Sequence, residues 1–180
     1  MDNDFLVTIV HNSYSDEETK AAFAKISSED LAKHLDYLIS SLEVSRVTMT
    51  WAKVLISKIE NKDVKGRLLD FIEYQRSDDP HIREVTAYLA NNKIDEQELI
   101  YNFELLVDYP EPSDEDVQKL TSDLALSIDP QKIKDKIDFL REKALSKNAD
   151  VRKLAERLIK NVDIPPCPHK TQEIVEMILS

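Results

Sequence analysis

Residues 79–89 read Asp-Pro-His-Ile-Arg-Glu-Val-Thr-Ala-Tyr-Leu, and the spacing within this stretch returns elsewhere in the chain. The shared template is Asp or Asn, two further residues, Val or Ile followed by Lys or Arg, and packing residues four and seven positions after the Val or Ile. Residues at such spacings lie on one face of an α-helix, so the template predicts stacked helices and names no reaction. Its three copies are Asp79, Ile82, Arg83, Thr86 and Leu89; Asn61, Val64, Lys65, Leu68 and Phe71; and Asn148, Val151, Arg152, Ala155 and Leu158.

The composition excludes several classes of fold and function. With 180 residues, 42% of them apolar, the chain is long enough for one domain with a sizeable core. Gly66 is the only glycine, whereas hairpin turns and phosphate-binding loops need glycine where φ is positive. We therefore expect neither a β-rich fold nor a glycine-loop nucleotide enzyme.

The charge balance is strongly acidic, with 24 basic and 35 acidic residues and a net charge of −11. The acids concentrate in the centre, since residues 61–128 hold 16 of them against 7 bases. A chain of this charge repels a phosphate backbone, so direct non-specific binding of nucleic acid is not expected.

Cysteine content and hydropathy favour an intracellular protein. Cys167 is the only cysteine and cannot form an intramolecular disulfide, and the Met-Asp-Asn-Asp start lacks the basic region of a secretory signal. The apolar run at residues 5–10 is far shorter than the roughly 20 residues of a membrane span. We expect a cytoplasmic protein that does not cross a membrane.

Helical periodicity continues through most of the chain and predicts about ten helices. Residues 5–10 are rich in β-branched side chains, yet no second strand-like run is present, so we expect a first helical turn or an arm packed on the body. A Pro-rich turn at residues 164–168 precedes a short terminal helix. The predicted helices occupy residues 16–26, 28–42, 44–59, 63–75, 79–91, 95–109, 113–128, 130–144, 151–162 and a final segment with Ile174, Ile178 and Leu179.

Helices of this length with short connections and no strand partner predict an all-α fold, an antiparallel helical array forming a single domain over residues 1–180. The Pro-rich break at residues 110–112 marks a possible sub-division.

The helix starts at residues 79–83, 148–152 and 61–65 resemble the second-helix signature of HEAT/armadillo-type repeats, and Asp129, Pro130, Ile133 and Lys134 resemble it with one extra residue. The copies at Asn61 and Asp79 depart from a regular two-helix period, because they begin adjacent helices. The resemblance implies a HEAT-like superhelix with an extended surface for partners, as in scaffolds, adaptors and inhibitors. An irregular α-bundle is the alternative.

The candidate binding site is an acidic tract. Residues 94–118 contain no Lys or Arg. Such a tract is either a solvated helix surface with helix-dipole partners or a patch that complements a basic protein partner. The residues we expect in the patch are Glu98, Glu104, Asp108, Glu111, Asp114, Glu115 and Asp116.

Other candidate sites have weaker patterns. Lys153, Arg157 and Lys160 form a basic helical stripe beside Arg152, but interleaved acids favour a solvated surface with intrahelical pairs. The four histidines (His11, His34, His81 and His169) match neither di-iron nor structural-zinc spacing. Cys167 and His169 between prolines form either a thiol beside a base or, more simply, a rigid turn.

These patterns together favour a non-enzymatic protein-interaction module, an adaptor, scaffold or inhibitor that presents an acidic surface to a basic protein and needs no cofactor. Two alternatives stay open. One is a small structural subunit of a larger complex, and the other is a helical metal-binding or thiol-dependent enzyme that uses His34, His81, Cys167 or His169.

Overall fold

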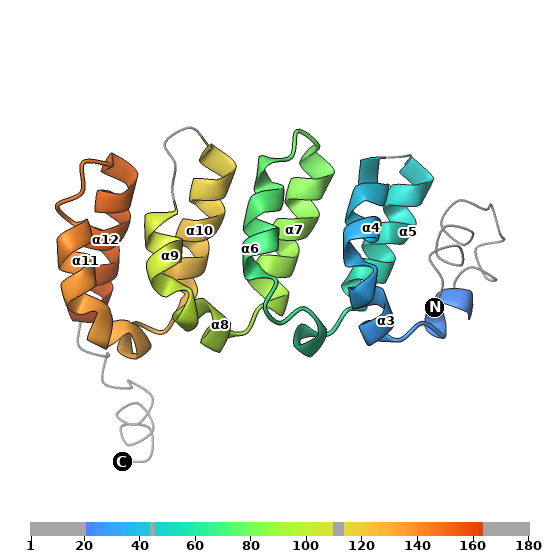
Figure 1. The fold of residues 1–180 in the computed structure, drawn as a ribbon, viewed down its shortest axis with the longest axis horizontal. Coiled ribbons are helices and arrows are strands. Elements are labelled where there is room, and N and C mark those ends of the chain that lie inside the picture. The colour runs from blue at the N-terminus through green and yellow to red at the C-terminus, as the bar shows by residue number, and fades with distance from the viewer. Residues whose placement is uncertain (1–20, 44–45, 110–113, 164–180) are drawn as a thin grey trace, which may run out of the picture. The chain divides into compact units, whose positions relative to one another are not determined.

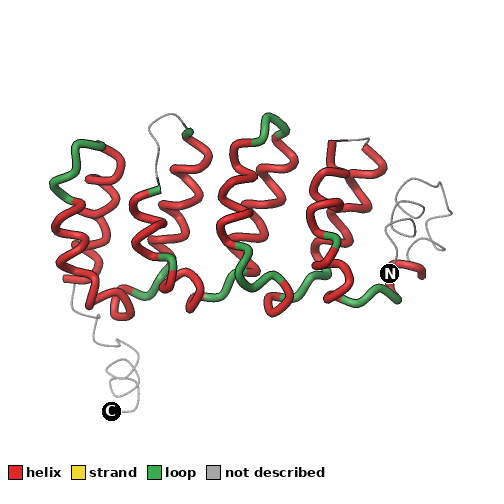
Figure 2. The backbone as a smooth tube through the Cα atoms, in the orientation of Figure 1, coloured by secondary structure: helices red, strands yellow, loops and turns green. Residues whose placement is uncertain are grey.

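The computed structural model of the chain describes residues 21–43, 46–109 and 114–163. Every regular element in these ranges is helical (Figure 2), as the scarcity of glycine predicts. The all-α class is therefore confirmed for this part of the chain. The predicted arm at residues 5–10, the Pro-rich turn at 164–168 and the terminal helix lie outside the described residues.

The chain forms two compact units, residues 1–125 (unit 1) and residues 126–180 (unit 2). In chain order, unit 1 contains α3 (Ser28–Lys33), α4 (Leu35–Ser40), η1 (Ser41–Glu43), α5 (Arg46–Ser57), η2 (Asn61–Asp63), α6 (Leu68–Glu73), η3 (Tyr74–Arg76), α7 (Pro80–Lys93), α8 (Glu96–Tyr101), α9 (Phe103–Asp108) and nearly all of α10 (Glu115–Ser127). Unit 2 continues with η4 (Pro130–Lys136), α11 (Ile137–Lys143) and α12 (Ala149–Asp163).

The boundary between the units does not fall at the Pro-rich break of residues 110–112. Arg76 and Arg83, which precede the break, form ion pairs with Asp114 and Asp116, which follow it. These contacts attach the start of α10 to η3 and α7. The break is therefore a connection within unit 1.

Unit 1 alternates first helices (α4, α6 and α9) with second helices (α5, α7 and α10). Figure 1 shows the first helices of unit 1 in one layer and the second helices in another, and the helices within each pair run side by side. The paired helices α4 and α5 contact each other, as do α6 and α7. First and second helices therefore present separate outer faces to solvent.

Helix starts recur along the chain at nearly constant intervals. The first helices α4, α6, α9 and α11 start at Leu35, Leu68, Phe103 and Ile137, intervals of 33, 35 and 34 residues. The second helices α5, α7, α10 and α12 start at residues 46, 80, 115 and 149, intervals of 34, 35 and 34. One two-helix pattern thus occurs four times in the described residues.

Three segments predicted as single helices are interrupted. Residues 130–144 change at Lys136 (φ −90°, ψ 8°) from the 3₁₀ helix η4 to α11. Residues 28–42 break at His34 (φ −110°, ψ 16°), whose N–H donates to the Leu31 carbonyl at 3.1 Å. Residues 95–109 break at Asn102 (φ −94°, ψ 11°), whose side-chain amide donates to the Glu98 carbonyl at 2.9 Å. The side-chain bond of Asn102 to the backbone competes with helical bonding. As a result of the breaks at His34 and Asn102, α4 and α9 each follow a short, separate helix.

The Asp79 copy of the template is confirmed as the start of a second helix. The Asp79 carboxylate caps α7 by accepting from the His81 N–H at 2.7 Å, and Pro80 occupies the first turn. Arg83 reaches back and donates to the Ser77 carbonyl at 2.5 Å. The basic residue of the template therefore fixes the loop that enters the helix.

The Asn148 copy has the same local structure in unit 2. The Asn148 side chain accepts from the Asp150 N–H at 2.9 Å and the Val151 N–H at 3.4 Å, and Arg152 donates to the Ser146 carbonyl at 3.0 Å. Two segments far apart in sequence thus build one motif from the same residue types. This agreement explains why the template contains a basic residue.

The Asn61 copy does not start a long helix, and the predicted helix over residues 63–75 is wrong in its first half. η2 ends at Asp63, Val64 adopts φ −108° and ψ 7°, and Gly66 adopts φ 83° before α6 begins at Leu68. Glycine tolerates this left-handed conformation, which strains other residues. The Asn61 and Asp79 copies therefore do not begin two adjacent long helices.

The core of unit 1 lies between the two helix layers. Most apolar positions of the described helices are buried, whereas Val54 is 41% exposed and Trp51 is half-buried and packs edge-on against Phe23 with ring centres 5.1 Å apart. The fully buried large side chains of unit 1 include Phe71, Phe103, Leu31, Leu35, Leu38, Ile39, Leu55, Ile56, Ile59, Leu68 and Ile72.

Unit 2 has a smaller core between α11 and α12, which contact each other. Asp129 caps η4 by accepting from the Gln131 N–H at 2.9 Å, and Pro130 follows it, as the sequence predicts. The buried apolar residues of the described part of unit 2 are Ile128, Ile133, Leu140, Val151, Leu154, Ala155, Leu158 and Val162.

Candidate functional site

The predicted acidic residues do not form one surface, and Glu98 has a structural contact. Its carboxylate is half-buried and accepts two backbone bonds from the turn before α6, from the Gly66 N–H at 2.9 Å and the Leu68 N–H at 3.2 Å. Asp95 caps α8 by accepting from the Glu98 N–H at 2.8 Å. Glu98 therefore joins α8 to the start of α6.

Asp114 and Asp116 are also engaged within unit 1. Asp114 is half-buried, accepts from the Val117 N–H at 3.1 Å and lies 3.7 Å from Arg76 Nε. Asp116 pairs with Arg83 Nε at 2.9 Å. These carboxylates position the first turn of α10, and the Asp116 side chain is still 54% exposed.

The remaining members of the predicted patch separate between two helices. Glu104 and Asp108 are exposed on α9, and Glu115 is exposed in the first turn of α10. Glu111 lies outside the described residues. The structure thus places Glu104 and Asp108 on the first-helix layer and Glu115 on the second.

The first helices carry a set of acids that the contiguous tract did not reveal. In their described sequences α4, α6 and α9 contain no Lys or Arg. The side chains of Asp36, Asp70 and Glu73 are 65%, 54% and 53% exposed. We define the acidic face as Asp36 on α4, Asp70 and Glu73 on α6, and Glu104 and Asp108 on α9.

A periodic signal in the sequence could have identified this face. Asp36, Asp70 and Glu104 are 34 residues apart in each step, and Asp138 of unit 2 follows after another 34. Within unit 1 the three occupy equivalent positions on successive first helices, directly after the residue that starts α4 or α9 and two after the start of α6. A search for unbroken acidic runs misses residues so far apart.

Arg67 connects the acids of α4 and α6. Its guanidinium donates to Asp70 Oδ2 at 2.9 Å and to Asp36 Oδ1. Partial burial works to lower the pKa of Arg67, but the hydrogen bonds to Asp36 and Asp70 outweigh it and raise that pKa overall. Arg67 therefore stays charged and relieves the repulsion between the two carboxylates.

Tyr74 completes this cluster around an open hollow. Its hydroxyl donates to Asp36 Oδ1 at 3.0 Å, and its pKa is raised by burial and by that hydrogen bond. Asp36, Arg67, Asp70, Glu73 and Tyr74 line the hollow, whose volume is about 440 Å³. The arrangement is a polar network with a net negative charge, at the centre of the acidic face.

A second network links α6 to the end of α9. The Tyr109 hydroxyl donates to Glu73 Oε1, and the Arg76 guanidinium lies 5.8 Å from the centre of the Tyr109 ring. Arg76 Nη1 is also 3.6 Å from Glu73 Oε2. The acidic face is thus held in place from both sides of α6.

Among the described residues, the histidines singled out from the sequence belong to no cluster that could hold a metal. No group of three or more His, Cys, Asp or Glu side chains suited to that role is present in this part of the chain. His34 lies at the α3–α4 break, and His81 Nδ1 is 3.7 Å from Glu84 Oε2. Cys167, His169 and His11 lie outside the described ranges.

Comparisons with known proteins give no assignment. No protein-family model matches the chain, and no curated protein or solved structure is significantly similar to it. Among the helices of the described residues, none is both long enough and apolar enough to cross a membrane.

Proposed function

We propose that the chain is a non-enzymatic interaction module whose acidic face binds a basic segment of a partner protein. The observation that carries the proposal is the absence of Lys and Arg from α4, α6 and α9, which together hold five acids. Exposed carboxylates on adjacent helices attract a cationic surface and accelerate its association. Arg67 pairs with Asp36 and Asp70, and Arg76 pairs with Glu73, so two arginines hold three of these carboxylates in place.

The HEAT-like arrangement is part of the same proposal. Its support is the recurrence of first and second helices at intervals of 33 to 35 residues, together with the shared loop motif before α7 and α12. This interval is shorter than the roughly 40 to 47 residues of HEAT and armadillo repeats. We therefore infer a compact helical repeat that uses its first-helix layer for binding.

A charge-reversal experiment tests the binding surface. The triple variant Glu73→Lys, Glu104→Lys and Asp108→Lys should bind a fluorescent Lys- and Arg-rich peptide at least about tenfold more weakly than the unchanged chain, because each exposed pair contributes up to about 1 kcal/mol and reversal adds repulsion. Fluorescence anisotropy measures the dissociation constant. Affinity capture followed by mass spectrometry then identifies natural partners.

A matched control distinguishes an effect specific to the acidic face from a general effect of the change in net charge. The triple variant Glu60→Lys, Glu115→Lys and Asp123→Lys changes exposed acids away from the acidic face by the same total charge. It should retain most of the affinity. Equal losses in both triple variants, or a wild-type affinity that is unchanged between about 0.01 M and about 1 M salt, would contradict the proposal, because screening shortens the range of charges about tenfold over that interval.

A further inference from the structure

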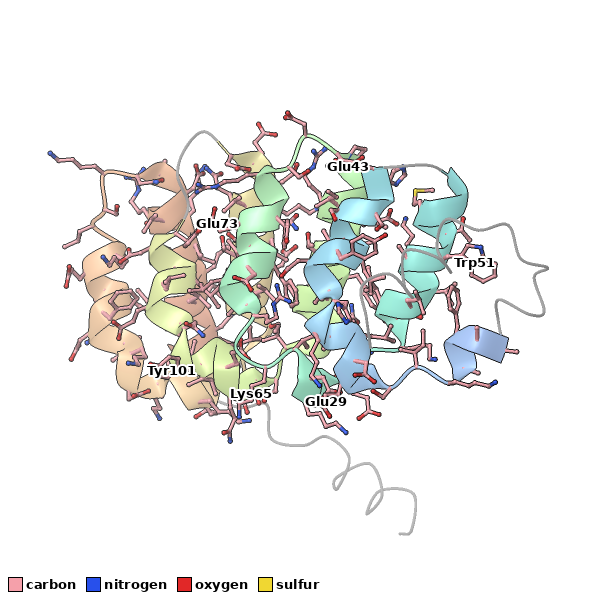
Figure 3. All side chains as sticks on the ribbon, turned by 45° about the vertical axis from the view of Figure 1, so that its right-hand side comes forward. Glu29, Glu43, Trp51, Lys65, Glu73 and Tyr101 are labelled. Atoms are coloured by element: carbon pink, nitrogen blue, oxygen red, sulfur yellow. The ribbon has the colours of Figure 1, made fainter. Side chains whose placement is uncertain are left out.

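A pocket beside the acidic face has a chemistry that the acidic face does not explain. It lies between α8 and the turn that leads into α6, has a volume of about 430 Å³, and is lined in part by Lys65, Leu68, Leu69 and Tyr101. Tyr101 is 89% exposed and Leu69 is 40% exposed. Figure 3 shows Tyr101 and Lys65 at the same edge of unit 1. Large apolar groups that meet around a hollow are typical of binding sites.

The walls of this pocket are fixed by polar contacts. Glu98 accepts from the backbone of Gly66 and Leu68 and so joins the two sides of the pocket. The helix break at Asn102 ends α8 directly after Tyr101 and leaves the ring on the surface. A preformed pocket costs less ordering on binding than one that must assemble.

The pocket is continuous with the acidic face through α6. Leu69 lines the pocket, whereas Asp70 and Glu73 of the same helix line the neighbouring polar hollow. Leu69 and Glu73 are four positions apart and therefore neighbours on one side of the helix. A chain segment that contacts the carboxylates of α6 is thus within reach of the pocket.

Charge decides what kind of molecule fits this composite surface. A second copy of the chain carries the same net charge of −11 and is repelled at long range. A cationic segment is attracted by the acids of α6, and the pocket walls offer an aromatic ring and leucine side chains to an apolar residue within it. Buried aromatic and aliphatic anchors supply most of the affinity of many protein interfaces, while surrounding charges guide association.

We propose that this pocket binds one large apolar side chain, of leucine or similar size, that lies within the basic segment held by the acidic face. The inference rests on the proposed function and adds a requirement to it. Lysine and arginine residues on either side of the apolar residue contact the acidic face, and the apolar residue contacts Leu69 and Tyr101. The partner is therefore a basic segment with an apolar anchor, and not a uniformly cationic one.

The test compares two synthetic peptides on the full chain. Both are rich in lysine and arginine, and they differ only in a central leucine or alanine. The unchanged chain should bind the leucine peptide about tenfold more tightly, as expected for partial burial of the extra carbons. Tyr101→Ala and Leu69→Ala should each reduce this leucine preference to about twofold or less, with little effect on the alanine peptide.

Two further variants separate the possible outcomes. Leu145→Ala, an 86% exposed leucine of unit 2, should keep the full leucine preference. The triple reversal at Glu73, Glu104 and Asp108 should weaken both peptides alike. Equal affinity of the unchanged chain for both peptides, or a leucine preference that survives Tyr101→Ala and Leu69→Ala, overturns the anchor pocket and leaves the acidic face standing. Absence of binding to either peptide overturns both proposals.

Discussion

Glu98→Ala should destabilise unit 1, because the Glu98 carboxylate holds the turn before α6. The side chain accepts from Gly66 N–H at 2.9 Å and from Leu68 N–H at 3.2 Å. Hydrogen bonds to a charged group contribute about 1.5 to 3 kcal/mol each. The first of these bonds is exposed to water and the second only partly buried, so we expect a combined loss of about 2 kcal/mol in the free energy of unfolding.

Urea denaturation followed by tryptophan fluorescence measures this loss. Trp51 is the only tryptophan, lies in unit 1 and packs against Phe23, so its emission reports the unfolding of that unit. With a slope of about 2 kcal/mol per molar urea, the midpoint should fall by about 1 M. Glu98→Gln retains one oxygen acceptor and should lose about half as much.

A neighbouring substitution provides the control. Gln97→Ala changes a side chain of similar length that is exposed on the same helix, and it should alter stability by no more than about 0.5 kcal/mol. If Glu98→Ala is as stable as Gln97→Ala, the two backbone contacts do not hold the turn. Folded Glu98→Ala should bind the basic alanine peptide about as tightly as the unchanged chain and should lose part of the leucine preference, because Glu98 joins the two sides of the pocket.

Three more predictions concern packing, a loop contact and pH. Leu89→Ala, at a fully buried position, should cost about 2 to 5 kcal/mol in urea denaturation. Arg152→Ala removes the donor to the Ser146 carbonyl and should cost about 1 kcal/mol while increasing amide hydrogen exchange in the loop before α12. The hydrogen bond from Lys53 lowers the pKa of Glu84 below the ordinary glutamate value of 4.5, so this contact stabilises the fold above that pH and is lost as the pH falls through the lowered pKa. Lys53→Ala should therefore reduce the urea midpoint near neutral pH and have a smaller effect at about pH 3, and equal effects at both pH values would rule the contact out.

The helix faces and several caps were predictable because they depend on local spacing. Asp79 and Asn148 each accept a hydrogen bond from the N–H two residues later, and Pro80 follows the first of them. The function of Arg83 and Arg152 was not predictable, since the carbonyls they reach belong to loops whose path is set by the fold.

The helix breaks at His34 and Asn102 could not be predicted from periodicity. Neither position has proline or glycine nearby, and the apolar spacing continues across both. The sequence distinguished the turn at Gly66 only by its glycine, because the apolar residues around it fit a helix equally well. Here contacts between distant segments override local helix propensity, and one of them is the hydrogen bond that Glu98 accepts from the N–H of Gly66 in that turn.

The sequence predicted an acidic candidate surface, but the predicted residues include only two of the five acids of the acidic face, Glu104 and Asp108. Glu104 and Asp108 are exposed on α9, and Glu98, Asp114 and Asp116 contact backbone or arginine partners. A contiguous acidic tract cannot distinguish these cases, because helix caps and solvent-facing carboxylates alternate within it. The two kinds of carboxylate lie on different sides of the helices, so only the structure distinguishes them.

The spacing of Asp36, Asp70 and Glu104 has a consequence for how a ligand is aligned. Each of three successive first helices carries one acid at an equivalent position. Because packed helices lie about 8 to 10 Å apart, these acids are expected at similar intervals along the acidic face. A uniformly basic segment bound to this face could shift by one helix and again place its cations beside acidic side chains. Arg67 distinguishes the first gap from the second, because it bridges Asp36 and Asp70. The proposed anchor pocket beside α6 is a second feature that is not repeated along the face. Together, Arg67 and this pocket would favour one alignment of the basic segment over the others that charge alone would permit.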